Sequence, residues 1–141
     1  MDVIYRLEKK LPLEEVMELY RIAGWLDETA QPALLEKMLE GSFAVQAAFD
    51  ADSGRLIGMM RALSDGVSDA YLLDLVVSPE ARRQGIGREI VERLAKHLAS
   101  LGVDWIVCIG APGTKAFYDT TNGKAMEGFV PWRFENPQDN S

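Results

Sequence analysis

One stretch of the sequence decides the fold: Leu75-Val76-Val77-Ser78-Pro79-Glu80-Ala81-Arg82-Arg83-Gln84-Gly85-Ile86-Gly87-Arg88. An apolar strand ends at Val77, and a loop with a proline and two arginines leads to the glycines that begin a predicted helix. The first turn of a helix leaves backbone N–H groups without partners, and its N-terminus carries the equivalent of roughly +0.5 charge. Because small residues let a phosphate approach such a backbone, the stretch predicts a site for a phosphorylated ligand.

The neighbouring segments predict a three-strand meander followed by a strand–helix–strand unit. Apolar side chains at helical spacing run from Ile86 to Leu101, and Gly102 ends this predicted helix. The wholly apolar residues 105–109 predict a strand buried on both faces and parallel to the strand before the helix. Upstream, turn signals separate three predicted strands, at residues 43–49, 56–63 and 70–77. The dense apolar character of the last one places it in the centre of the sheet.

The two ends of the chain supply the remaining predicted elements. These are a strand at 3–7, helices from Pro12 to Gly24 and from Pro32 to Gly41, a helix at 113–118 and a strand at 129–134 that closes the sheet. The loop 24–29 carries Trp25 and two acids, and two interpretations stay open for it, a lid over a substrate and an anchored connection. The length of 141 residues, without repeats or linkers, predicts a single domain over residues 1–141.

Composition excludes several classes of partner. A net charge of −7 argues against a nucleic-acid-binding surface, which needs clustered basic residues in excess. The single cysteine, Cys108, rules out an intrachain disulfide and predicts a buried thiol, and the single histidine, His97, rules out a metal site built on several histidines. No apolar run approaches the ~20 residues that span a bilayer. Because the N-terminus also lacks a basic start, we expect no signal peptide and a cytoplasmic protein.

Two nucleotide-binding patterns fail. The dinucleotide fingerprint G-x-G-x-x-G would require a third glycine where the chain has Ile90. The phosphate-loop pattern requires Ser or Thr after Gly123-Lys124, where the chain has Ala125. Neither a dinucleotide nor nucleotide hydrolysis is therefore predicted.

A third pattern fits. The segment Arg82-x-x-Gly85-x-Gly87, directly after a strand that ends in Val77-x-Pro79, resembles motif A of the GNAT family of acyl-coenzyme A-dependent N-acyltransferases. The order of predicted elements is also similar over nearly the whole chain. Four further segments look like a small bacterial subgroup of this family without a clear substrate assignment: Leu19-Tyr20-x-x-x-Gly24-Trp25, Ser64-Asp65-Gly66-Val67, Asp74-Leu75-Val76-Val77 and Thr114-Lys115-Ala116-Phe117-Tyr118.

The resemblance implies an α/β (α+β) GNAT fold, with a mixed, mostly antiparallel sheet, a splayed strand pair and about four flanking helices. It implies acetyl-coenzyme A as co-substrate, no metal, and direct transfer of the acetyl group to a primary amine of a small molecule or peptide. The cofactor-binding residues that it implies are Leu75, Val76, Val77, Arg82, Arg83, Gln84, Gly85, Ile86, Gly87, Arg88 and Tyr118. The backbone of Leu75–Val77 would pair with the pantetheine amides, which requires a strand edge that the sheet leaves open.

The resemblance also implies catalytic residues. Tyr118 falls where the family often places the general acid that protonates the leaving thiolate. Asp74 is our first choice for the base that collects the proton of the amine, directly or through water, and Asp65 and Asp69 are weaker choices. A structural role of Asp74 on its strand and proton transfer to water alone remain alternatives. Cys108 as an acyl carrier has no histidine partner in the sequence to support it.

Two other interpretations stay open. Residues 119–126 depart from the Leu-Gly-Phe-like turn that usually follows this tyrosine in the family. Together with the uncertain base, this leaves a catalytically silent domain that binds or senses acyl-coenzyme A as the alternative function. A homodimer formed through exposed closing strands is compatible with either function. The sequence does not identify the amine, although acids on predicted loops, such as Asp27 and Glu28, favour a cationic acceptor.

Overall fold

The computed structural model describes residues 1–136. Its elements are β1 (Val3–Leu7), α1 (Leu13–Ile22), α2 (Pro32–Gly41), β2 (Ala44–Asp50), β3 (Leu56–Ser64), β4 (Asp69–Val77), a 3-10 turn (Pro79–Ala81), α3 (Ile86–Ser100), β5 (Trp105–Cys108) and α4 (Lys115–Tyr118). The strands form one five-stranded sheet in the order β1-β2-β3-β4-β5. All neighbours are antiparallel except β4 and β5, which are parallel. The mixed, mostly antiparallel sheet with β4 inside it is thus confirmed.

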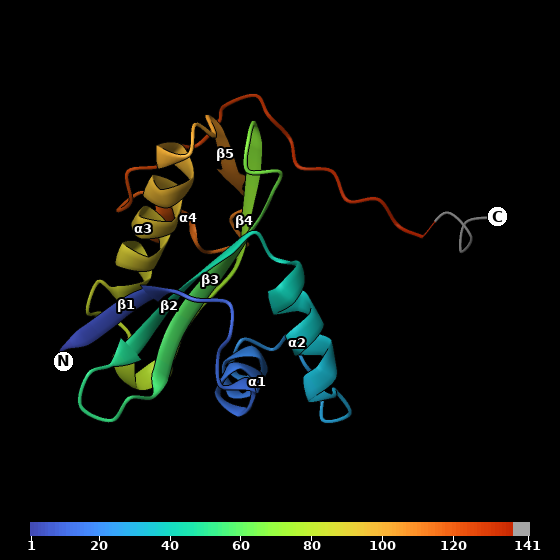
Figure 1. The fold of residues 1–141 in the computed structure, drawn as a ribbon. Coiled ribbons are helices and arrows are strands. Elements are labelled where there is room, and N and C mark those ends of the chain that lie inside the picture. The colour runs from blue at the N-terminus through green and yellow to red at the C-terminus, as the bar shows by residue number, and fades with distance from the viewer. Residues whose placement is uncertain (137–141) are drawn as a thin grey trace.

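Helices cover both faces of this sheet (Figure 1). The helix α3 packs on one face through Ile90, Leu94 and Leu98, while α1 and α2 pack on the other. Successive side chains of a strand point to opposite faces of the sheet, so one strand can contribute to both cores. In β3, Met59 belongs to the core with α1 and α2, and the next residue, Met60, belongs to the core with α3. In the described part of the chain, no helix is both long and apolar enough to cross a bilayer.

A bulge interrupts β4 at Asp74. The register of the β3–β4 ladder shifts between Met59 and Arg61, so one residue of β3 faces two residues of β4 at this point. The backbone of Asp74 has φ 59°, in the left-handed region that Asp tolerates better than most residues. The bulge turns the second half of β4 away from the line of its first half.

The strands β4 and β5 separate where the bulge begins. Only Asp69–Leu72 of β4 pairs with Trp105–Cys108 of β5, although β4 continues to Val77. The backbone of residues 73–77 therefore has no strand partner on the β5 side, as the splayed strand pair of the GNAT resemblance requires. A central strand thus has an open edge along half of its length.

Two predictions for the C-terminal part are wrong. Residues 129–134 do not close the sheet, because no strand forms there, and Trp132 and Phe134 are 79% and 91% exposed. As a result β5 is the last strand of the sheet and is not buried on both faces, since Trp105 is 45% exposed. An apolar pattern indicates that a segment tends to be buried, but within residues 1–136 only Phe129 packs against β5, with its ring centroid 6.2 Å from that of Trp105.

Close packing between α3 and the sheet generates a prediction. A Cβ atom added to Gly58 of β3 would lie 2.9 Å from Ile90 Cδ1 and 3.2 Å from the Val76 carbonyl oxygen. We expect Gly58→Ala to lower the free energy of unfolding by about 1–3 kcal/mol through overpacking. Urea denaturation measures this effect. Gly41→Ala in α2 is the control, since its Cβ would meet nothing within 4 Å, and equal effects of both changes would contradict the packing argument.

Candidate functional site

A cleft of about 970 Å³ opens where β4 and β5 diverge. Four parts of the chain line it: the second half of β4, the start of α3 with its preceding loop, the region from β5 to α4, and the end of α1 with the loop that follows. The lining residues include Leu75, Val76, Val77, Arg82, Arg83, Gly85, Ile86, Gly87, Arg88, Asp74, Tyr118 and Trp25. The fold therefore brings nearly all the site residues expected from the sequence to one cavity. Gln84 is the exception, because it does not line the cleft and its Nε2 donates to the Glu80 carbonyl oxygen at 3.4 Å.

The loop before α3 presents a set of unpaired backbone donors. Arg83 and Gly85 both have positive φ, 61° and 78°, which turns the chain sharply into the helix. The first helical hydrogen bond runs from the Glu89 N–H to the Gly85 carbonyl oxygen at 3.1 Å. Within residues 1–136, the N–H groups of residues 83–88 have no acceptor. Unpaired donors at the positive end of a 15-residue helix are suited to binding a phosphate.

The three arginines of this loop have different surroundings, although all line the cleft. Arg82 Nε donates to the Val77 carbonyl oxygen at 3.1 Å and so ties the loop to the end of β4. Arg88 forms an ion pair with Glu92 at 3.1 Å along the helix. In the described part of the chain, the guanidinium group of Arg83 has no partner. Arg83 is therefore the residue that is free to bind an anion.

The two glycines of the motif serve different purposes. Gly85 needs its left-handed backbone, and a Cβ there would meet no protein atom within 4 Å, so the space above it is open to a ligand. A Cβ on Gly87 would lie 3.2 Å from the Phe117 ring and 3.5 Å from Val77. Gly87 is thus required for packing α3 against α4 and β4, which its place in the sequence motif did not indicate.

Tyr118 is held at the end of α4, between the cleft and β5. Its ring packs edge-to-face on Phe117, with 4.9 Å between centroids, and lies close to Gly110, where a Cβ would be 3.5 Å from Cδ2. Burial, followed by the neighbouring Cys108 thiol, raises the pKa of Tyr118 to about 12. Burial likewise raises the pKa of Cys108. At neutral pH both groups are protonated, so Tyr118 is available as a hydrogen-bond donor and Cys108 is a poor nucleophile.

Asp74 occupies the bulge and already has two partners. Arg61 Nε forms an ion pair with Asp74 Oδ2 at 2.7 Å, and the Tyr20 hydroxyl donates to the same oxygen at 2.9 Å. Burial and the adjacent carboxylate raise the pKa of Tyr20, which keeps it a donor. The other oxygen, Oδ1, has no hydrogen-bond partner within residues 1–136. Asp74 therefore has a structural role through Oδ2, while its Oδ1 remains available to accept a hydrogen bond.

The two weaker candidates for the base lie outside the cleft. Asp65 caps the β3–β4 turn, where its Oδ1 accepts from the N–H groups of Val67 and Ser68 at 2.8 Å each. Hydrogen bonds from the Ser68 hydroxyl, the Ser68 N–H and the Val67 N–H hold the pKa of Asp65 well below its usual range. Asp69 is exposed at the start of β4. Neither residue lines the cleft, so only Asp74 of the three acids is placed at it.

The loop after α1 is an anchored connection rather than a free lid. The Trp25 N–H donates to the Tyr20 carbonyl oxygen at 2.9 Å, and the two rings pack edge-to-face at 5.2 Å. Trp25 nevertheless lines the cleft and is 45% exposed. Tyr71 of β4 also lines the cleft and is 36% exposed. Sequence reasoning did not identify Tyr71, and the Trp25 signal was ambiguous because a loop aromatic can serve either purpose.

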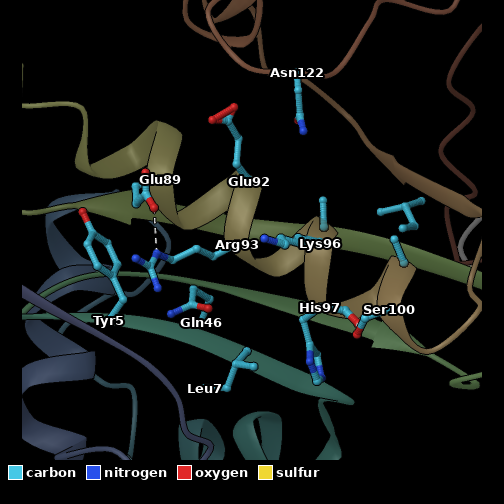
Figure 2. Close-up of a pocket in the computed structure, with 13 residues that line it drawn as sticks. Tyr5, Leu7, Gln46, Glu89, Glu92, Arg93, Lys96, His97, Ser100 and Asn122 are labelled. Atoms are coloured by element: carbon cyan, nitrogen blue, oxygen red, sulfur yellow. Dashed lines mark hydrogen bonds and ion pairs between the residues drawn. The ribbon is translucent and has the colours of Figure 1, made fainter.

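A second depression lies along α3, between this helix and the strands β1 and β2 (Figure 2). Its volume is about 950 Å³, and Tyr5, Glu89 and Arg93 contribute to its lining. These side chains bind one another, since Arg93 pairs with Glu89 at 2.8 Å and lies over the Tyr5 ring at 4.5 Å. Arg93 is thereby occupied, and the depression lies along the body of α3, away from the unpaired N–H groups of residues 83–88.

The cleft fits an extended ligand that carries a phosphate at one end. Such a ligand finds an open strand edge at residues 73–77 and a donor-rich loop beside Arg83 at the end of that edge. No group of three or more His, Cys, Asp or Glu side chains that could hold a metal ion occurs among the residues that the structure describes. A strand edge next to a phosphate loop is the site of the acyl-coenzyme A-binding class that the sequence resembles.

Comparison with known proteins identifies the family. The model of the acetyltransferase (GNAT) family matches residues 8–123. The chain therefore belongs to the GNAT acetyltransferase family. A GNAT family acetyltransferase from Streptococcus pneumoniae TIGR4 has the same fold, with a TM-score of 0.79 at 24% identity over 96% of this chain and 99% of that chain. The structure of AAC(6')-Iy with a coenzyme A-linked bisubstrate analogue aligns with a TM-score of 0.73 at 17% identity, over 96% of this chain and 100% of that chain.

Curated relatives are more similar in sequence but longer. Serotonin N-acetyltransferase 2, chloroplastic, of Oryza sativa subsp. japonica is 37% identical over 90 residues, or 62% of this chain and 45% of the relative. The uncharacterized N-acetyltransferase ycf52 of Porphyra purpurea is 26% identical over 118 residues, or 83% of this chain and 67% of the relative. The chain thus matches less than half of the length of the rice protein.

The contacts of Asp74 lead to a prediction about stability. We expect Asp74→Asn to lower the free energy of unfolding by about 1–3 kcal/mol, because it removes the ion pair with the mostly buried Arg61. Tyr20→Phe should cost about 1 kcal/mol through the loss of one hydrogen bond. Chemical denaturation measures both. The exposed Asp69→Asn is the control, expected within about 0.5 kcal/mol of wild type, and an equally small effect of Asp74→Asn would show that the ion pair does not hold the bulge.

Proposed function

We propose that this chain is an N-acetyltransferase that transfers an acetyl group from acetyl-coenzyme A directly to a primary amine of a small molecule or peptide. The observation that carries the proposal is the meeting of three features in one cleft. These are the open edge of β4, the unpaired N–H groups of residues 83–88, and the Tyr118 hydroxyl. Membership of the GNAT family supports the same reaction.

The chain's own residues account for binding of the co-substrate. The backbone of Leu75–Val77 would pair with the pantetheine amides, and the N–H groups of residues 84–88 would hold the pyrophosphate, with Arg83 adding positive charge. Acetyl-coenzyme A supplies the activated thioester when bound. An unpaired N–H group on the same strand edge can bind the carbonyl oxygen of the thioester. One segment would then both position the thioester and stabilise the negative charge that develops on this oxygen.

Proton movements involve Asp74 and Tyr118. Because Arg61 and Tyr20 bind only Oδ2 of Asp74, its Oδ1 can accept a proton from the acceptor amine, directly or through water. Tyr118 then donates a hydrogen bond to the leaving sulfur. With a pKa of about 12, against about 8.5 for a thiol, complete proton transfer from Tyr118 would be uphill by roughly 5 kcal/mol. We therefore assign Tyr118 to hydrogen bonding of the developing thiolate, with final protonation from solvent.

The lining of the cleft favours an aromatic or apolar amine over a polycation. Trp25 and Tyr71 present rings to the cleft, which can stack on an aromatic acceptor. The carboxylate of Asp27 is occupied within its own loop, where Oδ1 accepts from the Thr29 N–H at 2.8 Å. The name of the rice relative, a serotonin N-acetyltransferase, agrees with an arylalkylamine as the acceptor.

A catalytically silent acyl-coenzyme A-binding domain is the second candidate. The observation in its favour is that Asp74 carries structural bonds to Arg61 and Tyr20. Two measurements on the same protein separate the candidates: the thermal shift with coenzyme A, and thiol release from acetyl-coenzyme A with arylalkylamines, polyamines, aminoglycosides and peptide amines. Stabilisation with turnover on an arylalkylamine supports the proposal, and stabilisation without turnover supports the silent domain. No stabilisation at all would reject both.

Binding at the helix start can be tested with matched glycines. Gly85 and Gly54 both have positive φ and open space at the Cβ position, so alanine strains the backbone equally at each. We expect Gly85→Ala to weaken coenzyme A binding about tenfold, or about 1.4 kcal/mol, because the new methyl group occupies the phosphate approach. Isothermal titration calorimetry measures the affinity. Gly54→Ala should leave the affinity unchanged. Equal affinities of the two variants would show that the phosphate does not bind beside Gly85.

The role of Tyr118 has a signature in rate and pH. Tyr118→Phe should lower kcat roughly 100-fold and change the affinity for coenzyme A little. Since the raised pKa keeps Tyr118 protonated, the wild-type rate should rise with pH as the amine loses its proton, without an alkaline decline up to about pH 10. Steady-state rates from pH 6 to about 10 record this profile. Tyr5→Phe, outside the cleft, is the control, and a decline above pH 8 that disappears in Tyr118→Phe would contradict the assignment.

A further inference from the structure

The turn at the end of α1 fixes the aromatic ring of Trp25. Gly24 has φ 80°, in the left-handed region, and its N–H donates to the Arg21 carbonyl oxygen at 2.9 Å. The Trp25 N–H donates to the Tyr20 carbonyl oxygen, also at 2.9 Å. These two hydrogen bonds around a left-handed glycine form a Schellman motif, in which the side chain after the glycine packs on the side chain five positions earlier. The rings of Trp25 and Tyr20 make this contact edge-to-face, with 5.2 Å between centroids.

Tyr20 also reaches the candidate base. It is 2% exposed, and its hydroxyl donates to Asp74 Oδ2 at 2.9 Å. Tyr20 itself does not line the cleft, whereas Asp74 and Trp25 both do. Within residues 1–136, Tyr20 is the single hydrogen-bond or ring partner that Asp74 and Trp25 share. One buried side chain therefore joins an aromatic wall of the cleft to a carboxylate of the same cleft.

The carboxylate end of this link is held from a second direction. Arg61 Nε of β3 lies 2.7 Å from the same oxygen, Asp74 Oδ2. Arg61 Nη1 in turn donates to Ser42 Oγ at 3.4 Å. Because Oδ2 has one donor from α1 and one from β3, the carboxylate cannot rotate without losing a hydrogen bond. The position of the open Oδ1 relative to the Trp25 ring is therefore fixed by packing and hydrogen bonds behind the cleft.

We propose that Tyr20 is a positioning residue that sets the distance between the Asp74 carboxylate and the Trp25 ring, so that the site selects amines by spacer length. The spacer is the chain between the nitrogen and the aromatic ring of the amine. The inference rests on the proposed function and narrows its acceptor to arylalkylamines of one spacer length. An amine whose nitrogen reaches Asp74 while its ring stacks on Trp25 gains both contacts. A spacer that is one methylene too short or too long forfeits one of them, at a cost of about tenfold or more in kcat/KM.

The helix α3 provides a matched control for the turn, because it ends in the same motif. Gly102 has φ 94°, its N–H donates to the Ala99 carbonyl oxygen at 3.0 Å, and the Val103 N–H donates to that of Leu98 at 3.2 Å. A Cβ on Gly24 or on Gly102 would meet nothing within 4 Å, so alanine strains both turns alike. Gly102 and its hydrogen-bonded neighbours do not line the cleft.

Steady-state kinetics and calorimetry on the full chain test the proposal with benzylamine, 2-phenylethylamine, 3-phenylpropylamine and butylamine. We expect the wild type to prefer one phenylalkylamine over the other two by about tenfold or more, both in kcat/KM and in affinity for the coenzyme A complex. Gly24→Ala should raise KM for that amine about tenfold by displacing Trp25, with kcat and the KM for butylamine little changed. Gly102→Ala should change none of these constants, and equal effects of the two glycine variants would overturn the proposal.

Tyr20→Phe separates positioning from packing. The variant keeps the ring on which Trp25 packs but loses the hydroxyl that holds Asp74. Its kcat should fall about tenfold and its spacer preference should shrink to about threefold or less, while KM for the preferred amine and the affinity for coenzyme A stay within about twofold. Ile57→Val, which removes a buried methyl group from the core with α3, is the control for lost stability and should keep the wild-type kcat and preference. A Tyr20→Phe variant that changes only in thermal stability would contradict the positioning role.

The behaviour of the wild type separates failure of this inference from failure of the proposed function. Turnover of amines without a spacer preference, or of butylamine alone, overturns the inference and leaves acetyl transfer standing. Calorimetric binding of one phenylalkylamine with the expected preference, but no turnover of any amine, supports the role of Tyr20 and rejects acetyl transfer. If none of the phenylalkylamines binds or is turned over, the inference is overturned.

Discussion

The ion pair between Arg61 and Asp74 is the interaction on which the rest of this structure depends. It joins β3 to β4 at the point where the register shifts and where Asp74 adopts a left-handed backbone. Such a conformation persists only where its surroundings hold it, and here Arg61 and Tyr20 do so from two different elements. A regular ladder through Asp74 would keep β4 aligned with β5, and the cleft would not open.

The open cleft allows one strand to serve both stability and binding. On its β3 side β4 is paired before and after the bulge at Asp74 and contributes to both cores, while on its β5 side the backbone of residues 73–77 has no strand partner. The loop from Arg82 to Arg88 continues directly from this edge. Its unpaired N–H groups are stable in water but costly to bury without a partner, which agrees with the exposure of Arg82, Arg83 and Gly85 where they line the cleft.

The edge of the sheet formed by β5 has no further strand among the described residues. An apolar strand, β5, ends the sheet, and an apolar segment leaves the domain beside it. Exposed strand edges tend to pair with other chains unless something protects them. The groove beside β5 shares Tyr118 with the cleft.

The sequence by itself determined the order of the elements as far as α4, the glycine-containing start of α3 and the resemblance to the family, because strand and helix periods and the spacing of Gly85 and Gly87 are local properties. Only the tertiary structure decided what depends on distant residues. It assigned Gly87 to packing against Phe117, gave Asp74 its partners from β3 and α1, and brought Trp25 into the cleft. It also left residues 129–134 uncovered, since an apolar pattern records that a segment needs cover but not which part of which molecule supplies it.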